Sequence, residues 1–368
     1  MAGEANPGAA DGAQPLGVER RGAAAVITID RPAALNALSI AMRRALASAV
    51  ARIGRDPMIY AVVLCSAVPK AFSVGGDVRE MTALAARDLA AARKALAEEL
   101  ALCWLLECLS KPTVSLIDGR VMGTGVGISL YNTHRVAGEN YEFSMPETKI
   151  GYFPDCGVVH AFSRMPHAIG LYLGLTGRAI GRADALALKL VTHTIPAAEF
   201  AAIEARLADA DPVDPLLDDR HQDPGPAPLL AEARIIERFF GAPSLGEILE
   251  RLRHAASSDQ AFAATALAGL ERRSPLALAV TDRMIRGAAR LDLREALIQD
   301  GRLAYRFADL HDFREGVRAF LLDKDQRPAW RPASLALVTP AELDALFAPL
   351  GAEELHLPTR AEMQAARV

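Results

Sequence analysis

The first third of the chain alternates between short apolar runs and a stretch with apolar residues at helical spacing. Residues 23–30 read AAAVITID and residues 60–67 read YAVVLCSA, two runs typical of buried β-strands. Between them, residues 37–53 read ALSIAMRRALASAVARI, in which apolar residues recur every three or four positions as in an amphipathic helix. This order of strand, helix and strand predicts an α/β architecture.

The alternation continues for about 200 residues and then gives way to a helical pattern. Residues 82–109 predict one long helix rich in alanine and leucine, which Lys111-Pro112 ends before a third strand at TVSLID, residues 113–118. The segment DADPVDPLLDDRHQDPGPAPLL, residues 209–230, is dense in proline and aspartate and indicates a loop or linker. From about residue 229 onward the pattern is helical.

These changes of pattern divide the chain into five regions. We expect a disordered tail at 1–17, an α/β core at 18–200, a Pro/Asp-rich linker and helical insertion at 201–260, a C-terminal helical region at 261–346 and a tail at 347–368.

Composition and charge exclude two classes of partner. Hydrophobic residues make up 51% of the chain and aromatic residues 5%, which favours a helix-rich soluble protein. The 41 basic and 45 acidic residues are dispersed and give a net charge of -4, so no basic surface for nucleic acid is expected. No apolar run approaches the roughly 20 residues of a membrane span, so no membrane partner is expected either.

The four cysteines predict reduced thiols rather than a metal site or disulfides. Cys65, Cys103, Cys108 and Cys156 stand in apolar surroundings without CxxC spacing, and no clustered histidines accompany them. The first 17 residues contain no basic residue and no apolar segment of the kind found in signal peptides. We therefore expect a cytoplasmic location and no bound metal.

Two carboxylates stand in a stretch that is otherwise apolar. The segment FSMPETKIGYFPDCG, residues 143–157, contains Glu147 and Asp155, each next to a proline. A buried ionised carboxylate is costly unless it is paired, so a salt bridge or a turn cap is one interpretation. The other interpretation is a nucleophile or general acid/base with a shifted pKa.

Two glycine-bearing turns interrupt the α/β half of the chain. They read AFSVGGDVREM at 71–81 and GRVMGTGVGISLY at 119–131, and the second follows the TVSLID strand and opens an expected helix. Glycines at such a junction let backbone N–H groups approach a ligand, and the start of a helix favours developing negative charge, as in an oxyanion hole. The alternatives are close packing of helix on strand and a dinucleotide site, although the glycines are spaced GxGxG rather than GxGxxG.

Several segments resemble, in order and in spacing, the signatures of the crotonase (enoyl-CoA hydratase/isomerase) superfamily. They are KAFSVGGDVREM, KPTVSLIDGRVMGTGVGIS, FSMPETKIGYFPDCG and LTGRAIGRADALALKLVTH. The segment HDFREGVRAFLLDKDQRPAW, residues 311–330, and the length of the chain resemble the 3-hydroxyisobutyryl-CoA hydrolase branch. The similarity covers about residues 18–346 and implies a spiral of ββα units, with C-terminal helices covering the acyl site.

The resemblance also implies a site. A CoA thioester would place its carbonyl between the backbone N–H groups of Gly76 and Thr124, and Thr124 departs from the glycine that is usual in this branch. Glu147 would act as nucleophile or general base with Asp155 assisting, and Glu99 would contact the acyl group. No cofactor beyond the CoA of the substrate is implied.

The resemblance also distinguishes between the candidate reactions. Hydratases of the superfamily use two glutamates, and the first of these aligns with Gly127, so the resemblance favours hydrolysis of a short β-hydroxyacyl-CoA such as 3-hydroxyisobutyryl-CoA in valine breakdown. Two alternatives stay open: a hydratase or isomerase in which Glu147 alone moves a proton, and a non-catalytic CoA-thioester binder whose oxyanion geometry is lost at Thr124. Superfamily members often form trimers or hexamers, so a homo-oligomer is a further expectation.

Overall fold

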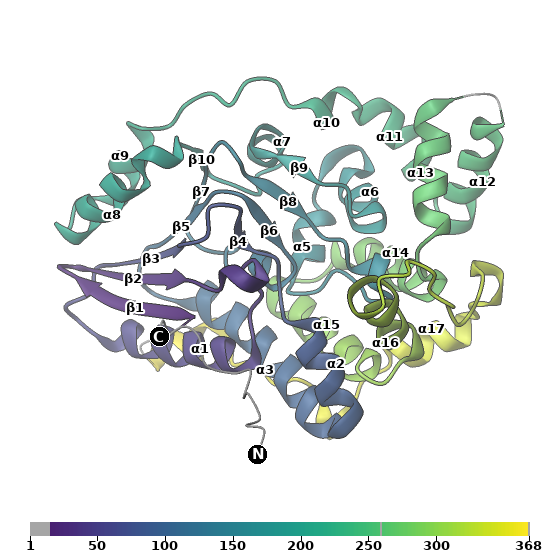
Figure 1. Ribbon diagram of the computed structural model, residues 1–368, viewed down its shortest axis with the longest axis horizontal. Helices are drawn as coiled ribbons and strands as arrows, with labels where there is room; N and C mark the ends of the chain where they lie inside the picture. The colour runs from purple at the N-terminus through teal and green to yellow at the C-terminus, as the bar shows by residue number, and fades with distance from the viewer. Residues whose placement is uncertain (1–14, 258–259, 367–368) are drawn as a thin grey trace, which may run out of the picture.

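The computed structural model describes residues 15–257 and 260–366, and its strands form two sheets, of which the smaller lies nearer the centre of the view and the larger to its left (Figure 1). The six-stranded sheet has the order β1-β2-β3-β5-β7-β10, and the four-stranded sheet has the order β4-β6-β8-β9. The bounds of the first sheet are β1 Leu16–Arg21, β2 Ala24–Ile29, β3 Ala61–Ser66, β5 Thr113–Ile117, β7 His134–Ala137 and β10 His193–Thr194. The bounds of the second sheet are β4 Ala71–Ser73, β6 Arg120–Met122, β8 Glu142–Ser144 and β9 Ile180–Gly181.

From β3 to β8, consecutive strands alternate between the two sheets. The strands β3, β5 and β7 enter the large sheet, and each is followed directly by β4, β6 or β8 in the small sheet. The pairs from β2 to β10 in the large sheet are parallel, and β1 pairs with β2 as an antiparallel hairpin. Each turn of the chain therefore adds one strand to each sheet, which is the spiral of ββα units that the resemblance implies.

Helices cover both faces of the large sheet, which explains why its strands are continuously apolar. Along β2, Ala25 and Ile27 pack into a core with α1 (Ile40–Arg55) and α3 (Leu89–Cys108), whereas Ala24 and Val26 face the other way. That second face is covered by α8 (Phe200–Ala208) and α9 (Val213–Asp218).

The remaining helices surround this core. The C-terminal helices α14 and α15 pack on α5, α6 and α3, and α11 to α13 gather at the end of the molecule farthest from α8 and α9 (Figure 1). Their bounds are α2 Val78–Arg87, α4 Thr124–Gly127, α5 Val158–Phe162, α6 Ile169–Thr176, α7 Arg182–Ala187, α10 Pro228–Ala231, α11 Ala233–Phe240, α12 Leu245–Ala256, α13 Ala261–Glu271, α14 Pro275–Ala288, α15 Leu293–Phe307, α16 His311–Val317, α17 Pro340–Phe347 and α18 Arg360–Ala365. Among the described residues, no helix combines the length and apolar character that a membrane crossing requires.

The single helix expected over 82–109 is divided into α2 and α3. Asp88 lies between them in an extended conformation with φ of -150°, and its side chain accepts a hydrogen bond from the Ala91 amide. An aspartate in this position satisfies the first orphan N–H groups of the following helix and so favours a new helix start.

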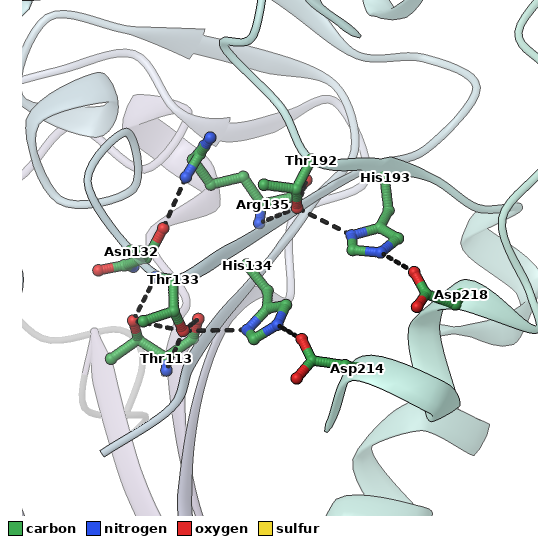
Figure 2. A network of polar contacts seen from close by, with 9 residues as sticks. All are labelled: Thr113, Asn132, Thr133, His134, Arg135, Thr192, His193, Asp214 and Asp218. Atoms are coloured by element: carbon green, nitrogen blue, oxygen red, sulfur yellow. Dashed lines mark hydrogen bonds and ion pairs between the residues drawn. The ribbon is translucent and has the colours of Figure 1, made fainter. Parts of the chain in front are cut away.

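The Pro/Asp-rich stretch is more ordered than a linker. It contains α9, whose Leu216 and Leu217 are buried, and α10 begins at its end. Figure 2 shows what holds α9 in place: Asp214 accepts a hydrogen bond from His134 at 2.8 Å, and Asp218 contacts His193 at 3.1 Å. The aspartates that suggested a loop instead bind this short helix to β7 and β10.

The two expected tails also differ from the sequence analysis. Residues 1–14 lie outside the described residues, and β1 begins at Leu16, within the N-terminal region expected to be disordered. At the other end, Leu357 is buried, and the Trp104 indole N–H donates to the Pro358 carbonyl at 2.7 Å. Residues 357 and 358 and helix α18 therefore pack on α3, whereas the division of the chain at residues 200 and 260 stays a prediction.

Candidate active site

The two glycine-bearing turns lie against each other. Gly75 has a φ of 100° and Gly123 a φ of 48°, values that favour glycine. A Cβ atom on Gly75 would lie 3.4 Å from the backbone nitrogen of Thr124, so the turns approach to van der Waals contact. Among the described residues, the backbone N–H groups of Gly76 and Thr124 have no recorded acceptor, and both residues line one cavity. The arrangement can present two amide donors to one ligand oxygen.

Thr124 keeps an ordinary backbone despite replacing a glycine. It is the first residue of α4, and its φ is not positive. Its amide is therefore one of the N–H groups at the start of a helix that have no partner within the helix. Its side-chain hydroxyl donates a short hydrogen bond to Glu99 Oε1. The threonine therefore leaves the backbone donor available and adds a hydroxyl beside it.

Glu99 is buried on α3 and both of its carboxylate oxygens have partners. Oε1 accepts the hydrogen bond of Thr124, and Oε2 forms an ion pair with the Arg43 guanidinium from α1. Only about 5% of each charged side chain in the pair is exposed, and burial lowers the pKa of Arg43. The carboxylate expected to contact the acyl group is thus held by groups of the protein itself.

The two carboxylates of the segment 143–157 meet at the same cavity. Glu147 begins a short 3₁₀ helix, Glu147–Ile150, and a Cβ atom on Gly123 would lie 3.2 Å from its Oε1 atom. Its Oε2 atom is buried without a hydrogen-bond partner among the described residues. Asp155 is equally buried and lines the same cavity.

Burial shifts both acids in the same direction. It raises the pKa of Glu147 well above the ordinary 4.5, the negative charge of Asp155 raises it further, and Arg273 opposes the shift. Burial also raises the pKa of Asp155 to about 6, against the positive charge of Arg43. Two negative charges in one buried site repel each other, so the two carboxyl groups do not readily ionise together. Such pairs are common in active sites where carboxyl groups exchange protons.

The cavity that these residues line has a volume of about 400 Å³. One wall is apolar and comes from the C-terminal region, where Phe313 lies on α16 and Phe320 and Leu321 lie in the π-helical turn Arg318–Leu322. The Lys149 ammonium lies 5.1 Å from the centre of the Phe320 ring. An apolar chamber with a few convergent polar groups is the usual form of a small-molecule site.

Gly127 leaves no room for a side chain. A Cβ atom there would lie 2.7 Å from the Cβ of Cys156 and 2.8 Å from the sulfur of Cys103. These distances are shorter than any normal contact, so the space that a hydratase needs for its first glutamate is filled by two thiols.

We expect Gly127→Ala to lower the free energy of unfolding by about 1–3 kcal/mol, because overpacking a closed core forces its neighbours to move. Urea denaturation measures this, with Gly269→Ala as the control, because a Cβ on Gly269 in α13 meets nothing within 4 Å. The control should gain up to about 1 kcal/mol from the better helix propensity of alanine. Equal stability of Gly127→Ala and the unmodified chain would contradict the observed packing.

One group of side chains could in principle hold a metal ion. Single ligand atoms of Glu99, Asp155 and Cys156 lie within 4.8 Å of one another. The Arg43 guanidinium already pairs with Glu99 there, and its positive charge disfavours a cation.

The structure thus brings together every site residue expected from the sequence and adds two others. Gly76, Thr124, Glu147, Asp155 and Glu99 all line the cavity, together with Arg43 and Tyr152. Neither added residue has a sequence signal of its own, since Arg43 sits in an Arg-Arg pair typical of an exposed helix face and Tyr152 stands in an apolar run typical of core.

Comparison with known families tests the fold and the resemblance. A family model described as enoyl-CoA hydratase/isomerase matches residues 24–347, a range that contains both glycine turns and both carboxylates. The chain belongs to the enoyl-CoA hydratase/isomerase family. Relatives include proteins named 3-hydroxyisobutyryl-CoA hydrolase, mitochondrial: the Xenopus laevis protein is 36% identical over 348 residues, covering 92% of this chain and 90% of the relative. The human protein is 34% identical over 355 residues, covering 94% of this chain and 91% of the relative.

Two solved structures share most of the architecture. An enoyl-CoA hydratase from Rhodobacter sphaeroides 2.4.1 superposes with a TM-score of 0.87 at 36% identity, covering 94% of this chain and all of that one. A carnitinyl-CoA dehydratase from Mycobacterium thermoresistibile gives a TM-score of 0.87 at 34% identity, covering 94% of this chain and 99% of that one. The crotonase-type fold and the resemblance to the hydrolase branch are both confirmed.

Proposed function

We propose that the chain hydrolyses the thioester of a short β-hydroxyacyl-CoA, of which 3-hydroxyisobutyryl-CoA is the leading candidate. The observation that carries the proposal is that Glu147 and Asp155 line one cavity with the free amides of Gly76 and Thr124. At Gly127, where hydratases have the first of their two glutamates, there is no space for a side chain. The names of the vertebrate relatives support the substrate class.

The geometry suggests how hydrolysis would proceed. The thioester oxygen would accept hydrogen bonds from the amides of Gly76 and Thr124, which stabilise the negative charge that forms as the carbonyl is attacked. Glu147 would either attack the carbonyl carbon or take a proton from an attacking water. When water attacks, the C–S bond would break to give the free acid, and the proton that Glu147 took would pass to the leaving CoA thiolate. When Glu147 attacks, the C–S bond would break to give a mixed anhydride on Glu147, which a water oriented by Asp155 would hydrolyse to the free acid, its proton going to the thiolate. The choice between nucleophile and base stays open.

The raised pKa values predict an acid-sensitive enzyme. Because the reaction needs an ionised Glu147, activity should be lost as the pH falls through the raised pKa of Glu147 and through the value of about 6 for Asp155. The acidic limb of kcat/KM, measured from pH 4.5 to 9, should therefore lie at or above about pH 6 rather than near pH 4.5. A profile that stays flat down to pH 5 would rule out the shifted pair.

Hydration is the competing reaction, since two solved relatives are named hydratase and dehydratase. The test is release of free CoA thiol from 3-hydroxyisobutyryl-, 3-hydroxypropionyl- and crotonyl-CoA, with the double-bond absorbance followed in parallel. Thiol release from the β-hydroxyacyl esters alone supports the hydrolase. A change in absorbance without thiol release supports a hydratase, and binding with neither signal supports a non-catalytic binder.

Location and assembly stay predictions. The relatives are named as mitochondrial, which argues against the cytoplasmic location expected from the sequence. Fractionation of cells that express the tagged full chain distinguishes a mitochondrial from a cytoplasmic location. Light scattering after gel filtration tests whether the chain is the expected trimer or hexamer.

A further inference from the structure

One buried hydroxyl at the active site has no hydrogen-bond partner. Tyr152 is only 5% exposed and lines the catalytic cavity, and its hydroxyl forms no hydrogen bond of normal geometry among the described residues, although its proximity lowers the pKa of Asp155. Leaving a buried polar group unsatisfied costs free energy, so such a group in a folded protein needs an explanation. A bound substrate that supplies the missing partner is the explanation we pursue.

The phenol ring is held rigidly by three phenylalanines. Phe153 stacks on it at 4.4 Å between ring centres, Phe313 lies at 4.8 Å, and Phe307 packs edge-on at 5.6 Å. These contacts come from the same loop and from α15 and α16, so the position of the hydroxyl is set from several directions. A fixed hydroxyl suits recognition, because little freedom remains to be lost on binding.

The charges around the hydroxyl keep it protonated. Burial raises the pKa of Tyr152 well above its ordinary value of 10, and the neighbouring acidic groups, Asp155 first, raise it further. The phenol is therefore a hydrogen-bond donor throughout the working pH range, and it lines the same cavity as Glu147 and Asp155.

The group expected to bind the acyl chain is already engaged. Both oxygens of Glu99 are taken, one by the Thr124 hydroxyl and the other by Arg43. An acyl group that carries a hydroxyl would bury it in an apolar chamber, where it needs a partner that the protein has not used. The Tyr152 hydroxyl is such a partner.

We propose that the Tyr152 hydroxyl donates a hydrogen bond to the β-hydroxyl oxygen of the bound acyl group and so selects β-hydroxyacyl-CoA over the corresponding acyl-CoA. Tyr152 is then a specificity-determining residue of the segment 143–157, in addition to its two carboxylates. This inference rests on the proposed thioester hydrolase function.

The test compares two esters that differ by one oxygen atom. Kinetic constants for 3-hydroxypropionyl-CoA and propionyl-CoA are measured with the unmodified chain and with Tyr152→Phe, which removes the hydroxyl and keeps the ring. We expect kcat/KM for the hydroxylated ester to fall about 5- to 10-fold, mainly through KM, and that for propionyl-CoA to change less than about 2-fold. Selectivity for the hydroxyl should fall accordingly.

The control is Tyr172→Phe. Tyr172 is as buried as Tyr152, but its hydroxyl accepts a hydrogen bond from Arg178 at 3.1 Å, and it does not line the cavity. This variant should keep the selectivity of the unmodified chain.

Two outcomes overturn the inference. In the first, Tyr152→Phe lowers kcat equally for both esters and moves the acidic limb of the pH profile, in which case the hydroxyl acts on Asp155 rather than on the substrate. In the second, selectivity is unchanged. Failure of the proposed function looks different, because the unmodified chain then releases no thiol from any ester. In that case the dissociation constants of the two esters, measured by calorimetry for both proteins, test the same selectivity.

Discussion

Glu147→Gln is expected to lower thiol release by about 10²- to 10⁴-fold, the range that one general acid/base group supplies. The substitution keeps the shape of the side chain but removes the atom that attacks or takes the proton. Binding of the CoA ester should stay within a few-fold, because the apolar wall and the two backbone donors are unchanged. Steady-state kinetics gives the first quantity and calorimetric titration gives the second.

The same substitution should not destabilise the fold. Burial raises the pKa of Glu147 in the folded chain, so ionisation of this group costs stability as the pH rises above the unfolded pKa. Replacing it with a neutral amide removes that cost, and the Tm of Glu147→Gln at pH 8 should equal or exceed that of the unmodified chain. The control is Glu142→Gln on β8, where the side chain is about half exposed and pairs with Arg120. Equal activity of Glu147→Gln and the unmodified chain would exclude the carboxylate mechanism.

Arg43→Met is expected to lower the free energy of unfolding by about 3–5 kcal/mol, because it leaves Glu99 charged, buried and unpaired. A double variant, Arg43→Met with Glu99→Gln, should recover most of this loss, since the neutral amide can still accept the hydrogen bond of Thr124. Urea denaturation of the two single variants and the double variant at one pH forms a double-mutant cycle for the pair.

The neighbouring residues provide a matched control. Arg44 pairs with Glu98 between the same two helices, but 52% of the Arg44 side chain and 34% of the Glu98 side chain are exposed. Arg44→Met should therefore cost less than about 1 kcal/mol, as exposed pairs do. If Arg43→Met and Arg44→Met have the same effect, the pair of Arg43 and Glu99 is not buried in solution as it is in this structure.

The strands were predictable because their patterns depend little on distant parts of the chain. The runs ending in Asp30, Ala67 and Asp118 correspond to β2, β3 and β5 within one or two residues, since a strand covered on both faces is apolar at every position. Helix α9 was not predictable in this way. Its proline and aspartate composition suggests a loop, whereas contacts with the histidines of two strands far away in the sequence and burial of its leucines hold the helix there.

The site shows the same division between local and distant information. Glu147, Asp155 and the two glycine turns belong to motifs that can be read locally, whereas Arg43 and Arg44 are adjacent and chemically identical in the sequence. Successive positions on a helix point about 100° apart, so one arginine enters the core and the other faces solvent. Only the packing of α1 on α3 shows that Arg43 is the buried arginine and Arg44 the exposed one.

The C-terminal wall of the cavity has a consequence for the order in which the site is made. Glu147 and Asp155 leave the ribosome before Phe313, Phe320 and Leu321, which follow them by more than 150 residues in the sequence. Before this wall is in place, we expect water to reach the carboxylates and to weaken the shift that burial imposes on their pKa values. The reactive groups thus precede the dry surroundings that tune them, and we expect catalytic competence only after the later segment has been synthesised and has packed on the site.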